Sequence, residues 1–150
     1  MMIGDEVVLD HKVGLEIRTL ANLTKRHIGN LPTIKSIESV TGIHSWLIGY
    51  LYNHQDKDIY QKDIEELFSI RRSTATAILQ RMEKNGLIMR VAVEHDARLK
   101  KIIITEKAAQ IQKQIEVEIS EFEKQIIRGI SQEELEAFYR ITEKMKANLE

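Results

Sequence analysis

The chain has 150 residues, enough for one domain or for one domain with helical extensions. Of these residues 43% are hydrophobic and 30% charged, which is the composition of a globular protein and excludes a disordered chain. It contains no cysteine, which excludes a disulfide framework and thiol-based redox sensing. No segment approaches the ~20 apolar residues that span a bilayer. The opening MMIGDEVV lacks the basic flank and apolar run of a secretory signal. We therefore expect a cytoplasmic protein.

Amphipathic helices are expected in the N-terminal third of the chain. They are residues 5–28, a brief piece at 36–40, and residues 41–52. In the first helix, apolar positions recur three or four residues apart at Leu9, Val13, Ile17 and Leu20. Gly29 and Pro32 mark its end. In the third helix we expect Trp46 to fill the core, because large aromatic side chains dominate core burial.

Two short helices joined by a tight turn are expected next, which is the pattern of a helix-turn-helix. The first is 61–68, with Ile64, Leu67 and Phe68 facing inward. The second is 73–84, capped by Ser73 and ended by Asn85–Gly86. Its apolar face consists of Ala75, Ile78, Leu79 and Met82. Thr74, Thr76, Gln80, Arg81 and Lys84 fall on its remaining surface, as expected of a helix that lies in the DNA major groove.

Two Val- and Ile-rich strands, 87–94 and 99–105, are expected to form a hairpin after this helix. The turn His95–Arg98 joins them and places Arg98, Lys100 and Lys101 at or near its tip. A cationic hairpin beside a helix-turn-helix indicates a winged helix, whose arginine can enter the minor groove. Asp96 can hold that guanidinium in place. The alternative for Asp96 and Arg98 is an ordinary surface ion pair.

The charge distribution favours a nucleic-acid partner more than the net charge of −1 does. Residues 71–101 contain eight Lys and Arg against three acidic residues, a local charge of +5, which leaves −6 for the rest of the chain. Basic charge concentrated on the second helix of the helix-turn-helix and on the hairpin is the distribution expected of a DNA-binding protein.

Two more amphipathic helices are expected at the C-terminal end. Residues 106–128 carry an apolar stripe that Gly129 ends, and Ser131 and Glu134 form a capping box for the last helix. The first and last two helices hold more apolar surface than one small winged domain can bury, which predicts a homodimer. The alternative is a monomer in which the N-terminal helix covers the C-terminal pair. The expected organisation is 1–34 dimerisation helix, 35–105 winged helix-turn-helix and 106–150 dimerisation helices.

The segment RRSTATAILQRMEKNGLIMR, followed by DAR and IIITEKA, resembles the signature of the MarR family of bacterial transcription regulators. Met82 and Ala108 depart from the usual Leu and Gly. The resemblance implies a mainly α fold with a small β-hairpin (α+β), binding double-stranded DNA as a homodimer and repressing transcription at a palindromic operator. It implies base or phosphate contacts by Arg72, Ser73, Thr74, Thr76 and Gln80, with Arg98 in the minor groove and Asp96 behind it. From the residues themselves we also expect DNA contacts by Arg81, and phosphate contacts by Lys100 and Lys101.

The resemblance also implies a small aromatic or anionic effector that releases DNA. Its candidate contacts are Arg18, His27, Trp46 and Tyr50, each with core packing or plain exposure as the alternative. No catalytic motif is present, and the five histidines lack a metal-ligand spacing, so we expect neither an enzyme, nor a metal, nor a cofactor. Activation in place of repression, and a winged helix used for protein–protein contact, remain open.

Overall fold

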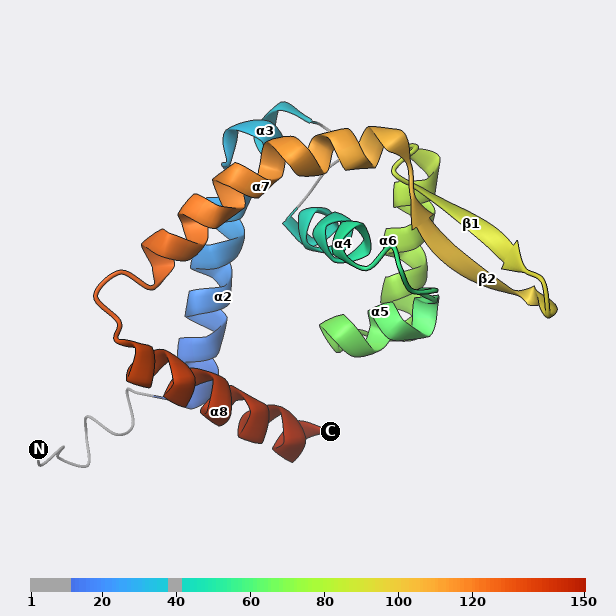
Figure 1. Cartoon of the computed structure of the whole chain (residues 1–150). Helices are drawn as coiled ribbons and strands as arrows, with labels where there is room; N and C mark the ends of the chain where they lie inside the picture. The colour runs from blue at the N-terminus through green and yellow to red at the C-terminus, as the bar shows by residue number, and fades with distance from the viewer. Residues whose placement is uncertain (1–11, 38–41) are drawn as a thin grey trace, which may run out of the picture. The chain divides into compact units, whose positions relative to one another are not determined.

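The computed structural model describes residues 12–37 and 42–150. Its elements, drawn in Figure 1, are α2 (Val13–Gly29), α3 (Pro32–Ser36), α4 (Gly42–Asn53), α5 (Gln61–Phe68), α6 (Arg72–Lys84), β1 (Ile88–Val93), β2 (Asp96–Ile104), α7 (Glu106–Ile126) and α8 (Gln132–Leu149). The chain forms two compact units that divide between Glu118 and Ile119, within α7. The expected helical residues 5–11 and 38–41 lie outside the described residues.

The core of the first unit is formed by the end of α2, by α4, α5 and α6, by the hairpin, and by the first half of α7. Its largest fully buried side chains are Ile28, Leu47, Ile48, Ile64, Leu79, Met82, Leu87, Ile88 and Ile115. On α4 the buried stripe runs through His44, Leu47, Ile48 and Leu51, one helical face. Burying each large apolar side chain contributes about 1.5–3 kcal/mol, so this core holds the two short helices in place.

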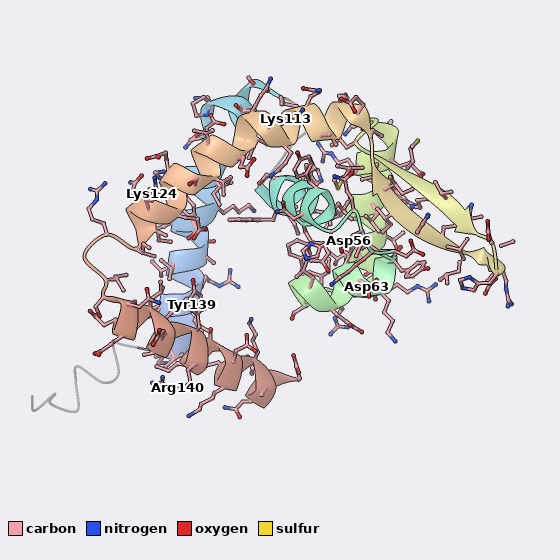
Figure 2. The ribbon with its side chains drawn as sticks, in the orientation of Figure 1. Asp56, Asp63, Lys113, Lys124, Tyr139 and Arg140 are labelled. Carbon is pink, nitrogen blue, oxygen red and sulfur yellow. The ribbon has the colours of Figure 1, made fainter. Side chains whose placement is uncertain are left out.

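The turn between α5 and α6 is set by its backbone. Ser69 adopts the left-handed conformation at φ 50°, and the amide of Ile70 donates to the Glu65 carbonyl at 3.0 Å. At the other end of α5, the Asp63 carboxylate accepts from the Tyr60 amide at 2.8 Å (Asp63 is labelled in Figure 2). These contacts fix both ends of α5, which packs against α6 as a helix-turn-helix.

The hairpin is an antiparallel pair in which Arg90 faces Ile102 and Ala92 faces Lys100. The second strand begins earlier than expected, at Asp96, whereas β1 is shorter than the expected 87–94. Val93 pairs with Asp96, so the turn is residues 94–95 and Arg98 lies within β2. At the base, the Ile102 amide donates to the Ile59 carbonyl at 2.7 Å. Figure 1 shows the tip of this hairpin pointing away from α4, α5 and α6. The unit is a winged helix.

Three local expectations were wrong. Ser73 does not cap α6, because the helix begins at Arg72 and its N-cap is Arg71. Leu67 faces solvent with 45% of its surface exposed, since Ile64 already occupies the buried side of α5. Trp46 is 38% exposed rather than a core residue, because Leu47 and its stripe take the inner face of α4.

The remaining helices leave apolar side chains in solvent. On α2 these are Val13, Leu15, Ile17, Leu20 and Leu23, and on α8 they are Phe138, Tyr139, Ile141 and Leu149. In the second unit α8 has no buried residue, and Figure 2 labels Tyr139 and Arg140 on it. The start of α8 has the expected capping box: Ser131 Oγ accepts from the Glu134 amide at 3.1 Å, and Glu134 Oε1 accepts from the Ser131 amide at 3.2 Å.

Across the described part of the chain, we find no helix with the length and apolar character needed to cross a membrane.

Candidate nucleic-acid interface

Helix α6 presents one buried face and one open face. Ala75, Leu79 and Met82 are completely buried, which anchors the helix on the core. The side chains on the open face are Arg72, Ser73, Thr74, Gln80 and Arg81, all exposed. Because its apolar face packs on the core, α6 leaves its short polar side chains and its cations accessible to a binding partner.

Thr76 differs from its neighbours because its hydroxyl is already engaged. The Gln61 side-chain amide donates to Thr76 Oγ1 at 2.8 Å and, at 3.4 Å, to the Arg72 carbonyl. Gln61 therefore joins the first turn of α5 to the first turn of α6. Gln61 was not among the predicted site residues, although its place at the start of α5, next to the helix-turn-helix turn, could have suggested a role.

On the hairpin, Arg98 extends into solvent with 94% of its side chain exposed. Asp96 Oδ1 accepts from the Arg98 amide at 2.9 Å and lies 3.5 Å from Nε of the guanidinium. The shorter of these two contacts fixes the backbone of Arg98. The ion pair itself is exposed, and exposed pairs typically contribute less than about 1 kcal/mol.

The two adjacent lysines of β2 point to opposite faces, since successive strand residues alternate. Lys100 lies with Arg98 on the face that also carries Arg90 of β1. Lys101 lies on the other face, where its ammonium is 3.5 Å from Asp58. The structure thus brings Lys100 together with Arg98 and does not bring Lys101 to the same place.

Between α5, the start of α6 and the hairpin lies a groove of about 520 Å³, which we call the wing groove. Among its lining residues are the cations Lys62, Arg72, Arg90, Arg98 and Lys100 and one acid, Glu65. Arg90 is the second residue that the sequence analysis missed as a site residue. Its Nε lies 3.7 Å from the Glu83 carboxylate, and its side chain is only 24% exposed.

The candidate effector residues lie on two helices. Arg18 and His27 belong to α2 and are exposed, whereas Trp46 and Tyr50 stand one turn apart on α4. The Tyr50 ring lies 4.3 Å from the His54 ring, centroid to centroid, and the Tyr50 carbonyl contacts His54 Nδ1 at 2.8 Å. Within the described residues no group of three His, Asp or Glu side chains is placed to hold a metal ion.

Known proteins share both the sequence pattern and the fold. Residues 38–99 match the MarR family. The crystal structure of the transcription regulator MarR from Oenococcus oeni PSU-1 has a TM-score of 0.79 and 28% identity, covering 91% of this chain and 99% of that one. The chain is therefore similar to the MarR family over residues 38–99 and has the fold of a MarR regulator. The segment matched to the MarR family contains all of α6 and the hairpin as far as Arg98 and Leu99.

Two further structures share the MarR-family fold. The heme sensor protein PefR from Streptococcus agalactiae, in complex with heme, has a TM-score of 0.59 and 26% identity, covering 98% of this chain and 95% of that one. The S. aureus MepR–DNA complex has a TM-score of 0.82 over 93% of this chain and 97% of that one. Its identity is 22%, so this likeness establishes the fold alone.

Proposed function

We propose that this chain belongs to the MarR family, binds duplex DNA as a homodimer at a palindromic operator and represses transcription. The observation that carries the proposal is the open polar and cationic face of α6, held beside a hairpin whose Arg98 is 94% exposed. The major groove, about 12 Å wide, admits one helix, and a narrow minor groove attracts arginine. The fold is also the one that holds DNA in the MepR complex.

Each proposed contact has a role that follows from its position. Five side chains of α6 face the major groove: Arg72, Ser73, Thr74, Gln80 and Arg81. The hydroxyl of Thr76, which accepts from Gln61, can still donate a hydrogen bond there. Arg98 enters the minor groove, with Asp96 fixing its backbone at 2.9 Å. Lys100 meets a phosphate, and Lys101 does so after releasing Asp58.

Dimerisation is supported by the apolar side chains that α2 and α8 leave exposed. A second copy would bury them at about 25 cal/mol per Å² of apolar surface. A two-fold axis would then present two copies of α6, roughly 34 Å apart, to successive turns of one DNA face. The organisation proposed is 1–34 and 106–150 for dimerisation and 35–105 for DNA binding. A dimer seated on an operator excludes other proteins from that DNA, which is the physical basis for repression.

A small aromatic or anionic effector would release DNA by binding the DNA-incompetent dimer better than the competent one. PefR, which shares the fold, is a heme sensor. Arg18, His27, Trp46 and Tyr50 are the candidate contacts in this chain. Because Trp46 is the only tryptophan, its fluorescence reports directly on binding near α4.

Selection of duplexes from a random pool tests the function. We expect recovery of an inverted repeat whose half-sites are about one helical turn apart. Recovery of sequences without symmetry would contradict the dimeric geometry. The second candidate function, a winged helix for protein–protein contact, is favoured by the apolar side chains Met89 and Val91 exposed on the hairpin. Absence of any enrichment, together with salt-indifferent binding, would support that alternative.

A further inference from the structure

Arg90 is an arginine whose hydrogen-bonding capacity the fold does not use. Its Nε and Nη2 atoms are buried and have no hydrogen-bond partner. The Glu83 carboxylate stands 3.7 Å from Nε, close enough to attract the charge but too far for a hydrogen bond. Buried polar atoms in proteins are nearly always hydrogen-bonded, so these two nitrogens of the guanidinium indicate a missing hydrogen-bond acceptor.

The surroundings of Arg90 define what that partner must be. The register places Arg90 opposite Ile102 and on the same hairpin face as Lys100 and Arg98, all of which line the wing groove. Lys62 and Arg72 line the same groove from α5 and α6. These five cations share the groove with one lining acid, Glu65, and the remaining excess of positive charge favours an anion. A guanidinium offers a planar fork of N–H donors that matches the oxygens of phosphate.

We propose that the wing groove binds one backbone phosphate of duplex DNA, with Arg90 as its innermost ligand. The inference rests on the proposed DNA-binding function and adds to it a defined phosphate site. Arg90 is 24% exposed whereas Arg98 is 94% exposed, so only a small protruding group reaches Arg90. A phosphate meets that requirement, because it projects from the duplex as a single compact anion.

The site would also set the register of the protein on DNA. Its lining includes Arg72 at the start of α6 and Arg98 on the hairpin, which are assigned to the major and minor grooves. A phosphate held between them fixes how far apart these two contacts fall along the duplex. Phosphate contacts position a protein on DNA, while contacts to base edges specify the sequence.

The test uses the full-length protein with two duplexes, one recovered by selection and one scrambled. Binding of the wild type, Arg90→Gln and the charge-matched control Arg128→Gln is measured over a range of salt concentrations. Arg128 is an exposed residue after the end of α7. Losing one phosphate contact should reduce the slope of log affinity against log salt by about 0.9 for each bound chain. We expect Arg90→Gln to show this reduction and to weaken both duplexes equally, and Arg128→Gln to bind as the wild type does.

A second arm identifies the phosphate. Single methylphosphonate substitutions remove one backbone charge at a time from the selected duplex. The wild type should lose affinity at one position in each half-site, and Arg90→Gln should be insensitive there. Arg90→Lys keeps the charge and so should keep most of the salt slope while losing the fork geometry; this variant also serves if Arg90→Gln fails to fold.

A purely structural role for Arg90 predicts a different pattern. If Arg90 only links the hairpin to α6 through Glu83, then Glu83→Gln should weaken DNA binding. If Arg90 binds phosphate, Glu83→Gln removes a competing anion, and DNA binding should be unchanged or stronger. An unchanged salt slope in Arg90→Gln, a loss confined to the selected duplex, or weakened binding by Glu83→Gln would each overturn the phosphate site while leaving the DNA-binding function in place. Failure of the wild type to bind any duplex would overturn both.

Discussion

Asp96 and Gln61 position other residues of the candidate interface through hydrogen bonds. Asp96 accepts from the Arg98 amide at 2.9 Å, so its main effect is on the backbone that carries the guanidinium. Gln61 bridges α5 and α6 through Thr76 at 2.8 Å. The sequence analysis predicted Asp96 because it stands two residues from Arg98. It could not predict Gln61, whose partner is 15 residues away and becomes a neighbour only when both helices fold.

Replacing Arg98 by Ala should weaken binding to the selected duplex by about 1–3 kcal/mol, because it removes one base or groove contact. Fluorescence anisotropy at fixed salt measures the change. The fold should be unaffected, since the Arg98 side chain is 94% exposed. Affinity equal to that of the wild type would refute the assignment of the hairpin to the minor groove.

Thr76→Val keeps the shape of the side chain but removes the acceptor for Gln61. We expect a loss of about 0.5–1.5 kcal/mol in the free energy of unfolding, measured in urea, as for a typical hydrogen bond. Gln61→Ala should cost a similar amount. The double variant should lose little more than either single variant, and fully additive losses would show that the two side chains do not interact.

At the scale of the elements, helical periodicity predicted α5 at 61–68 and located α6, because an amphipathic pattern identifies a helix directly. Helical periodicity could not identify the buried face of α4, because apolar residues occur on nearly all sides of this helix. Trp46 turned out to be on the exposed side. Ser73 failed as a cap because the Ala75 amide already donates to the Arg71 carbonyl at 3.0 Å, which starts α6 earlier. Arg90 was missed because its groove depends on strand register.

Leu79 anchors α6 on the core and is completely buried. Leu79→Ala should reduce the free energy of unfolding by about 2–5 kcal/mol, through lost burial and the cavity left behind. Chemical denaturation gives the value. The matched control is Leu67→Ala on α5, which is 45% exposed and should cost much less. Equal losses at the two positions would contradict the assignment of the inner face.

The capping box at the start of α8 should make the stability of the protein depend on pH. Hydrogen bonds from the backbone and side chain of Ser131 lower the pKa of Glu134 below its ordinary value of 4.5. The folded-state pKa is therefore the lower one, so the stabilisation is complete above the unfolded pKa and is lost as pH falls through the folded pKa. The stability difference between wild type and Glu134→Ala should shrink on going from neutral pH to below that range. A difference that grows in acid would contradict the capping box.

At the scale of the whole molecule, the two units contribute differently to the proposed function. Unit one carries α6, the hairpin and the wing groove, and unit two carries α8 with apolar side chains in solvent. The +5 segment, residues 71–101, lies entirely within the first unit. The surfaces that pair in a dimer depend on a second copy of the chain, so no single segment of the sequence predicts them.

Self-association should depend on the apolar faces of α2 and α8. Sedimentation at micromolar concentration should show a species of twice the 17.4 kDa chain mass. Replacing Ile141, which is 46% exposed on α8, by Glu should shift the protein toward the monomer and weaken DNA binding with it. Lys144→Glu on the same helix is the control and should remain dimeric. A wild type that sediments only as a monomer would refute the dimer.

If α6 and the hairpin together bind duplex DNA, the affinity of the protein for a duplex must depend strongly on salt. We expect log affinity to fall steeply and linearly with log salt concentration between about 50 and about 200 mM, because bound phosphates release counterions. The fall should be less steep in Arg98→Ala. A wild-type protein that does not bind duplex DNA, or binds it with an affinity independent of salt, would contradict the account.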